Sequence, residues 1–288
     1  MGPVRSVDVV STGTVRIRPE HVESNGTSLY WWLFTSTRWT TPRPINVYVI
    51  EHDDGLVLFD AGQDRRSVTE ADYFPTGFTG LIYSRLARFQ IGPDQTLSAR
   101  LASIGHDVSD VRTVVLSHLH QDHIGGLREL SGAEVLVSAT EWAQLDDSRA
   151  AMKGFLVNHI DLPGIRWKLV EPAAVTDAAI APFRTAHDVY GDGSLLLLPT
   201  PGHTPGSLSM LVRQPGMPPL LMVGDVTYDV RLLEAGRVPG VGEAERLRRT
   251  TTEIAALRRR HPDLVVLAAH DPAAADLLQA SQATRGAA

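Results

Sequence analysis

The sequence predicts an α/β fold, in which short strands and helices alternate and the strands form a mixed β-sheet. Three observations support this prediction. Apolar, β-branched runs of strand length recur along the chain, and several of them stop at a His or Asp residue. Segments with apolar residues at helical spacing lie between these runs. At least one pair of runs is joined by a hairpin turn, which a purely parallel sheet does not contain.

The first half of the chain predicts a hairpin, a helix and a buried strand. Residues 46–50 and 56–59 are β-rich runs on either side of an Asp-Gly turn, which is the pattern of a hairpin. Residues 96–104 carry apolar side chains at helical spacing, and Gly105 follows as a candidate C-cap. Residues 111–116 are apolar and β-branched, so they predict a buried strand that ends where the histidines begin.

The second half predicts further strands and one long helix. Residues 195–198 and 208–212 are strand-like runs that flank a loop rich in proline and glycine. Residues 220–223 form another such run, which a Gly-Asp pair interrupts. Residues 243–260 have a polar face and helical periodicity, and residues 264–268 predict a last strand.

Length and composition limit the class of protein. No repeat and no low-complexity linker divides the 288 residues, so we expect a single domain over residues 1–288, with a frayed tail at 280–288. The hydrophobic fraction of 43% and the charged fraction of 21% are those of an ordinary globular protein. The net charge of -6 argues against nucleic-acid binding. No apolar run approaches the ~20 residues that a membrane span needs, so we expect no membrane partner.

The chain contains no cysteine. This excludes disulfide bonds, thiolate nucleophiles and every zinc site that uses sulfur ligands. Any transition metal must therefore be bound through imidazole and carboxylate groups. The absence of cysteine also fits a reducing compartment, and we expect a cytoplasmic location.

The strongest chemical signal is the run of residues 118–123, His-Leu-His-Gln-Asp-His. In an extended segment, side chains alternate, so His118, His120 and Asp122 point the same way. His123 breaks this alternation, which requires a turn that the two following glycines make easy. Such a segment offers four ligands to two adjacent metal ions. Imidazole and carboxylate ligands suit zinc, and also iron, manganese or cobalt.

Three further candidates follow predicted strands later in the chain. His203 lies in the rigid Pro-Gly loop, Asp225 follows the run at 220–223, and His270 follows the last strand. Each of them alone is weak, because a single histidine is more often an ordinary hydrogen-bonded residue and an aspartate after glycine is often a helix cap. Taken together, their order along the chain and their positions after strands make the three residues stronger candidates for metal ligands.

These residues together resemble the motifs of the metallo-β-lactamase superfamily. The likeness extends from about Asn46 to His270, and its His-x-His-x-Asp-His core is highly specific. The resemblance implies a four-layer αββα sandwich, with two mixed sheets flanked by helices and the site at one edge of both sheets. Asp60, in the run Phe-Asp-Ala-Gly, is similar to the first motif, whose aspartate supports the ligand loop.

The same resemblance implies a ligand set for two divalent ions per chain, with zinc as the expected metal. By that likeness, one ion is held by His118, His120 and His203. The other is held by Asp122, His123 and His270, and Asp225 bridges both.

Within the superfamily, the chain is most similar to the N-acyl homoserine lactonases. The absence of cysteine excludes the β-lactamases that use a cysteine ligand. Residues 191–206 resemble the corresponding lactonase segment, and Tyr228 lies three residues after Asp225, where those enzymes place a tyrosine that faces the substrate carbonyl. The alternative for Tyr228 is a half-buried core residue.

The resemblance implies a metal-dependent hydrolase that opens lactone rings through a shared hydroxide. Tyr228 would donate a hydrogen bond to the carbonyl oxygen, Asp122 or a water would return a proton to the leaving alkoxide, and Asp225 would bridge the metals. The expected partner is a small lactone or ester, with a homodimer expected from the resemblance alone. An esterase, a phosphotriesterase or another lactonase with the same metal site stays open, as does an iron oxygenase or a non-catalytic metal-binding module.

Two aromatic clusters and six histidines match no motif. The clusters, at 30–34 and 73–89, are either packing residues or the wall of a channel, a lid or a dimer contact. The histidines are expected to be ordinary; they are His21, His52, His106, His159, His187 and His261.

Overall fold

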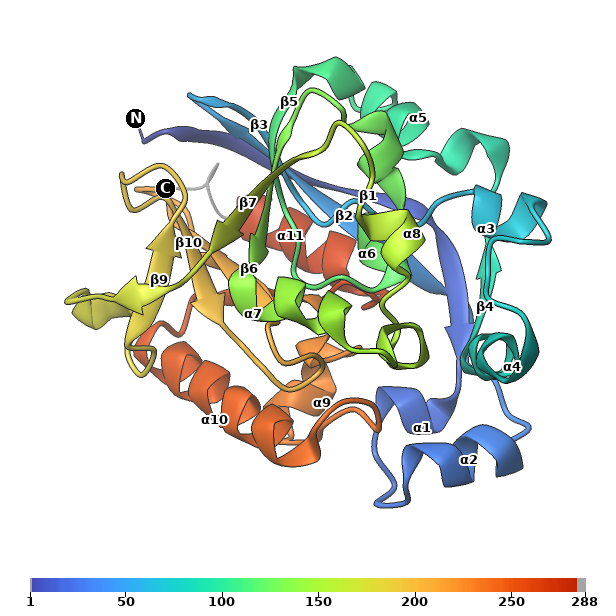
Figure 1. Cartoon of the computed structure of the whole chain (residues 1–288). Coiled ribbons are helices and arrows are strands. Elements are labelled where there is room, and N and C mark those ends of the chain that lie inside the picture. The colour runs from blue at the N-terminus through green and yellow to red at the C-terminus, as the bar shows by residue number, and fades with distance from the viewer. Residues whose placement is uncertain (1, 284–288) are drawn as a thin grey trace.

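The computed structural model of the protein describes residues 2–283. Two β-sheets lie face to face, with helices on both outer sides (Figure 1). In this view α10 covers one side at the lower left and α5 the other at the upper right. This is the predicted αββα sandwich, and the prediction is confirmed. Among residues 2–283, every helix is too short or too polar to cross a bilayer.

The first sheet has seven strands in the order β4-β1-β2-β3-β5-β6-β7. Its first four strands are antiparallel, whereas β3, β5, β6 and β7 pair in parallel. The sheet is therefore mixed, as predicted. Its strands are β1 (Val4–Ile17), β2 (Arg43–His52), β3 (Gly55–Phe59), β4 (Ala87–Gln90), β5 (Val111–Val115), β6 (Glu134–Ser138) and β7 (Arg166–Val170).

The second sheet has six strands in the order β13-β12-β11-β10-β9-β8. All of its pairs are antiparallel except β12 with β13. Its strands are β8 (Ala173–Ala174), β9 (Thr185–Asp188), β10 (Leu195–Pro199), β11 (Leu208–Val212), β12 (Leu220–Met222) and β13 (Val265–Leu267).

Helices and turns fill the connections. The α-helices are α1 (Pro19–Val22), α2 (Leu29–Thr35), α3 (Arg66–Thr69), α4 (Gly77–Leu86), α5 (Leu97–Ala102), α6 (Gln121–Ile124), α7 (Ala139–Trp142), α8 (Val157–Ile160), α9 (Val230–Glu234), α10 (Ala244–Arg260) and α11 (Ala274–Ala283). Short 3₁₀ turns are found at Pro93–Gln95, Val108–Asp110, Gly125–Glu129, Ala143–Asp146, Ala150–Lys153, Ala178–Ile180 and Gly224–Val226.

The alternation of side chains along each strand builds the layers. In β10, Leu195 and Leu197 face the other sheet and join the cluster between the sheets, whereas Leu196 and Leu198 pack under α9 and α10. The strands of the first sheet behave in the same way: Tyr48 faces the second sheet and Val49 faces the outer helices. Because both faces of the central strands are buried, these strands are almost continuously apolar.

The predicted elements lie close to where the sequence placed them, but the tail was only partly correct, and the strands β1, β4, β6, β7, β8 and β9 were not predicted. The prediction of a frayed tail was wrong for residues 280–283, which continue the helix α11. Ser281 is buried there, and Gln282 donates a hydrogen bond to the carbonyl of Val7. Residues 284–288 lie outside the described part of the chain. The long strand β1 was missed, because Gly13 and register shifts interrupt its apolar alternation.

Candidate metal centre

The predicted site residues come from loops that follow strands of both sheets. His118 and His120 follow β5, and Asp122 and His123 lie on the short helix α6 that comes next. The other three follow strands of the second sheet: His203 after β10, Asp225 in the 3₁₀ turn after β12, and His270 after β13. The strands end at one edge of the sandwich, so residues that are up to 152 positions apart in sequence meet there.

The structure brings all seven predicted ligands together. Their candidate ligand atoms form overlapping groups in which all atoms lie within 4.8 Å of one another. One group has three imidazoles and another has a carboxylate with two imidazoles; a third, fully buried group lies between them. The groups are His118, His120 and His203; Asp122, His123 and His270; and His118, His123 and Asp225.

Asp225 lies between the two outer groups. Its Oδ1 is 3.4 Å from Nε2 of His123 and 3.5 Å from Nε2 of His270. Its Oδ2 is 3.6 Å from Nε2 of His203, in the other group. A carboxylate that turns one oxygen to each group has the placement required of a bridging ligand.

Most of the imidazoles are oriented by a hydrogen bond on their outer nitrogen. Nδ1 of His123 contacts Asp60 Oδ2 at 2.8 Å, and Nδ1 of His270 contacts the carbonyl of Pro44 at 2.9 Å. Nε2 of His120 contacts the carbonyl of Lys153 at 3.0 Å. A proton on each outer nitrogen leaves the lone pair of the inner nitrogen directed into the cluster.

The inner atoms fit a metal site. Within the described part of the chain, Nε2 of His118, Nε2 of His123 and Oδ1 of Asp225 are buried and have no hydrogen-bond partner. Buried polar atoms normally find partners, so a group of orphaned lone pairs directed at one point suits bound cations.

The charge states of three of the groups agree with this donor set. Burial lowers the pKa of His118 and of His203 well below the ordinary value, so these rings are neutral. Burial would raise the pKa of Asp225, but the neighbouring His270 and His123 outweigh it and hold that pKa well below its usual range. His123 differs: burial lowers its pKa, but Asp60 and Asp225 outweigh burial and raise it, so a metal must displace a proton there.

Asp60 supports the ligand loop from the end of β3. Its carboxylate accepts hydrogen bonds from the backbone N–H of Ser117 at 2.7 Å and from the Ser117 hydroxyl at 3.0 Å, besides its contact with His123. Its φ of 65° lies in the left-handed region, which Asp and Asn adopt more readily than most residues. Asp60 therefore lies where the first motif was expected to act.

Glu141 is a supporting residue that the sequence analysis missed. This fully buried carboxylate accepts from the backbone N–H groups of Leu119 at 3.1 Å and Gly206 at 3.0 Å, and from the Thr204 hydroxyl at 2.8 Å. It thus joins the loop that carries His118 and His120 to the loop that carries His203. Its one sequence signal is a lone glutamate just after an apolar run.

Tyr228 is both a core residue and a site residue. Its side chain is only 2% exposed and packs in a cluster with Ile17, Trp32 and Ile45. Its hydroxyl donates a hydrogen bond to Oδ2 of Asp225 at 2.6 Å. Burial, followed by the charge of Asp225, raises the pKa of Tyr228 well above its ordinary value, so the phenol keeps its proton and remains a donor.

A cavity of about 580 Å³ opens beside the cluster. Part of its lining, which we call the metal wall, consists of His120, Asp122, His203, Asp225, Tyr228 and His270. Another part, which we call the apolar wall, comes from β1, α2, α4 and β4. It consists of Val15, Ile17, Leu29, Tyr30, Ile82, Tyr83, Leu86 and Phe89.

The two aromatic clusters divide between packing and the cavity. Tyr30, Tyr83 and Phe89 line the cavity. Trp32 and Tyr73 are buried, whereas Trp31 is 63% exposed and Phe78 is 56% exposed. Burial thus supports the packing role for part of the clusters, and the role of the residues that line the cavity or are exposed stays a prediction.

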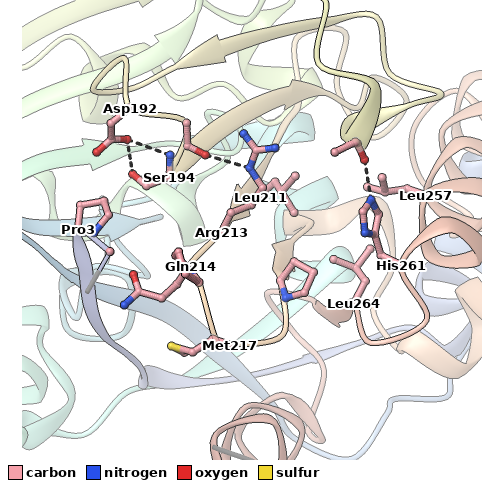
Figure 2. A pocket seen from close by; sticks show the side chains of 15 residues that line it. Pro3, Asp192, Ser194, Leu211, Arg213, Gln214, Met217, Leu257, His261 and Leu264 are labelled. Atoms are coloured by element: carbon pink, nitrogen blue, oxygen red, sulfur yellow. Dashed lines mark hydrogen bonds between the residues drawn. The ribbon is translucent and has the colours of Figure 1, made fainter.

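A second cavity, of about 440 Å³, lies elsewhere in the molecule (Figure 2). It has an apolar floor, which includes Leu211 and Leu264, and Arg213 projects beside it. Arg213 is already engaged by the Gly193 carbonyl at 2.9 Å and by Asp177 at 2.5 Å. None of the seven candidate metal ligands lines this cavity.

Comparison with known proteins gives consistent matches. The family model described as the metallo-β-lactamase superfamily matches residues 40–270. The N-acyl homoserine lactonase AttM of Agrobacterium fabrum is 29% identical, over 80% of this chain and 82% of that protein. A metallo-hydrolase of Mycobacterium tuberculosis is 33% identical, over 83% and 77%. A solved N-acyl homoserine lactone hydrolase, with the product N-hexanoyl-L-homoserine bound at its catalytic metal center, has a TM-score of 0.74 at 20% identity and covers 94% of this chain and 95% of its own.

Proposed function

Since the chain belongs to the metallo-β-lactamase superfamily, we propose that it is a dinuclear metal-dependent hydrolase that opens the ring of N-acyl homoserine lactones. Such an activity would destroy quorum-sensing signals. One observation carries the proposal: five of the seven clustered candidate ligands line a cavity that is also lined by the apolar side chains of the apolar wall. The lactone head group of such a substrate is polar and suits the metal ligands, whereas its acyl chain is apolar and suits the apolar wall. The relatives named as N-acyl homoserine lactonases favour the same substrate.

Two divalent ions are proposed as the cofactors, with zinc as the metal. One would be held by His118, His120 and His203, the other by Asp122, His123 and His270, with Asp225 shared. Ions at this site would supply a hydroxide nucleophile near neutral pH and would polarise the ester carbonyl. The neutral imidazoles and the ionised Asp225 are donors that zinc accepts readily.

Tyr228 and Asp122 are proposed to act on the substrate. The Tyr228 hydroxyl lies on the cavity wall and keeps its proton, so it can turn from Asp225 to a carbonyl oxygen that gains charge. The Asp122 carboxylate is 18% exposed and lines the same cavity, so it can take a proton and return it to the leaving alkoxide. Asp225 is proposed to act as the ligand that both ions share.

The acyl chain is proposed to lie along the apolar wall. Leu29, Ile82, Leu86 and Phe89 present apolar surface to a cavity of about 580 Å³. Ligand sites of a few hundred Å³ that are mostly apolar and carry a few placed polar groups are typical for small molecules.

The alternatives differ in substrate and not in the metal site. An arylesterase, a phosphotriesterase or another lactonase would use the same cluster, and an iron oxygenase would use it with oxygen. The test is a panel of acyl homoserine lactones, aliphatic lactones, aryl esters and phosphotriesters on metal-loaded protein. Ring opening releases a proton, which a pH indicator records. Turnover of esters or phosphotriesters orders of magnitude faster than of every lactone would refute the lactonase proposal, and oxygen uptake would favour the oxygenase.

The homodimer, the cytoplasmic location and the single domain stay predictions. The oligomeric state can be measured by light scattering of the purified protein. Trp31 and Phe78, which are strongly exposed, are the residues to substitute if a dimer is found.

A further inference from the structure

His21, on the short helix α1, lies against Tyr228. Its Nε2 is 3.0 Å from the Tyr228 hydroxyl oxygen, and the two rings meet edge to face with centroids 5.0 Å apart. His21 also lines the 580 Å³ cavity. His21 was expected to be an ordinary histidine because it matches no motif, and it lies 207 positions from Tyr228 in the sequence.

The direction of the hydrogen bonds follows from the partners of the phenol. The Tyr228 hydroxyl has one proton, and Asp225 Oδ2 lies 2.6 Å from it. A carboxylate that binds metal is ionised and only accepts, so the phenol proton lies on the contact with Asp225. The contact with His21 must then be donated by the imidazole, from Nε2–H to the phenol oxygen.

The other nitrogen of His21 is consistent with this tautomer. Burial lowers the pKa of His21 to about 4, so the ring is neutral and a proton on Nε2 leaves Nδ1 as an acceptor. Nδ1 is buried and has no hydrogen-bond partner among residues 2–283. An unpaired buried acceptor is unfavourable. The orientation of the His21 ring is therefore not explained by hydrogen bonds that both of its own nitrogens would gain.

We propose that His21 is a positioning residue, whose Nε2–H holds the Tyr228 oxygen in place while the phenol proton turns from Asp225 to the substrate carbonyl. This proposal rests on the proposed function of the cluster. Without His21, the phenol oxygen would be held by Asp225 alone, and turning its proton would release it. A hydroxyl that accepts a hydrogen bond is also a better donor, because successive hydrogen bonds polarise one another.

The test is a double-mutant cycle with His21→Phe, Tyr228→Phe and the double variant, all metal-loaded. We expect His21→Phe to lower kcat about two- to tenfold, the size of one hydrogen bond, with KM little changed. In the Tyr228→Phe background the same substitution should have no further effect, because the oxygen that it positions is gone. His21→Gln should recover much of kcat, since its amide can donate to the same oxygen.

Equal losses in both backgrounds, or no loss in either, would overturn the proposal. Metal content and thermal unfolding of each variant are measured beside kcat, so that a folding defect is recognised. If the parent opens no acyl homoserine lactone, the proposed substrate fails, and the cycle is then run on the ester that the parent hydrolyses fastest.

A second measurement is independent of activity. Nitrogen NMR of imidazole-labelled protein distinguishes the two histidine tautomers, and the spectrum of His21→Gln identifies the His21 signals. We expect the Nε2–H tautomer in the parent and a shift of this signal in Tyr228→Phe. An Nδ1–H tautomer in the parent would overturn the proposal whatever the kinetics show.

Discussion

The two walls of the 580 Å³ cavity are built in different ways. The metal wall consists of side chains that follow strands of the two sheets, and most of its imidazoles have their outer nitrogen held by a hydrogen bond. The apolar wall comes largely from α2, α4 and β4, at the edge of the fold, where neighbouring side chains such as Trp31 and Phe78 are more than half exposed. The candidate metal ligands are thus positioned by the central strands of the sandwich, whereas the apolar wall is formed by elements at the edge of the fold.

This difference predicts two kinds of substitution. Changes on the metal wall should alter metal binding or turnover for every substrate. Changes on the apolar wall should alter the preference among substrates and leave metal content unchanged. The following predictions test the distinction, beginning with the largest effect.

Loss of Asp225 as a shared ligand should have the largest effect. Asp225→Asn removes the charge that lies between the two groups, so we expect turnover to fall by more than about 10²-fold, beyond the loss typical of residues that only support ligands. Metal titration of the parent should reach two divalent ions per chain, and a chelator should abolish turnover. A firm ratio of one ion per chain would contradict the dinuclear site.

Asp60→Asn should weaken metal binding without removing a ligand. Asparagine tolerates the positive φ of 65°, but it no longer accepts from His123 as a charged group. We expect a loss of about 10–100-fold in metal affinity, measured by competition with a chromophoric chelator. Asp54→Asn is the matched control, because Asp54 is an exposed carboxylate 3.3 Å from His52. An equal loss in both variants would show that the support by Asp60 is not specific.

Tyr228→Phe should reduce turnover about tenfold and leave the metal in place. An oxyanion donor is typically worth ~10²–10³, but a metal would share the charge here. The ring remains, so packing with Ile17 and Trp32 should persist. Kinetics and metal analysis are measured beside the parent. Unchanged turnover would assign Tyr228 to the core alone, and loss of metal or folding would make it structural.

Leu86→Ala should have the narrowest effect, because its effect depends on the substrate. Leu86 lines the apolar wall, so we expect kcat/KM to fall by about tenfold for long acyl chains and little for short ones. Leu81→Ala is the matched control, because Leu81 lies on the same helix, is 43% exposed and does not line the cavity. A similar loss for short and long chains would argue against an acyl site on this wall.

Much of the fold was predictable because it depends on local patterns. The Asp-Gly turn between 46–50 and 56–59 predicted the hairpin of β2 and β3, and the periodicity of residues 243–260 predicted α10. The strand β1 was not predicted, because its long run is broken by Gly13 and because its pairing with β2 shifts register, which only the partner strand defines.

The candidate ligands were predictable for a similar reason. Four of them lie within residues 118–123, so their short spacing marked them, although the extended alternation expected up to Asp122 was wrong because the helix α6 begins at Gln121. His203, Asp225 and His270 each follow an apolar run, so their strand ends marked them before any contact was known.

Tertiary structure alone decided which other residues join the site. Glu141 contacts Leu119 in one loop and Gly206 in another, which are 87 positions apart, and His21 contacts Tyr228 across 207 positions. Sequence periodicity describes how one segment turns its side chains, but it does not describe which distant segment they will meet. That is set by the packing of the two sheets, which brings the apolar wall, Glu141 and His21 to a metal cluster that the sequence by itself had already outlined.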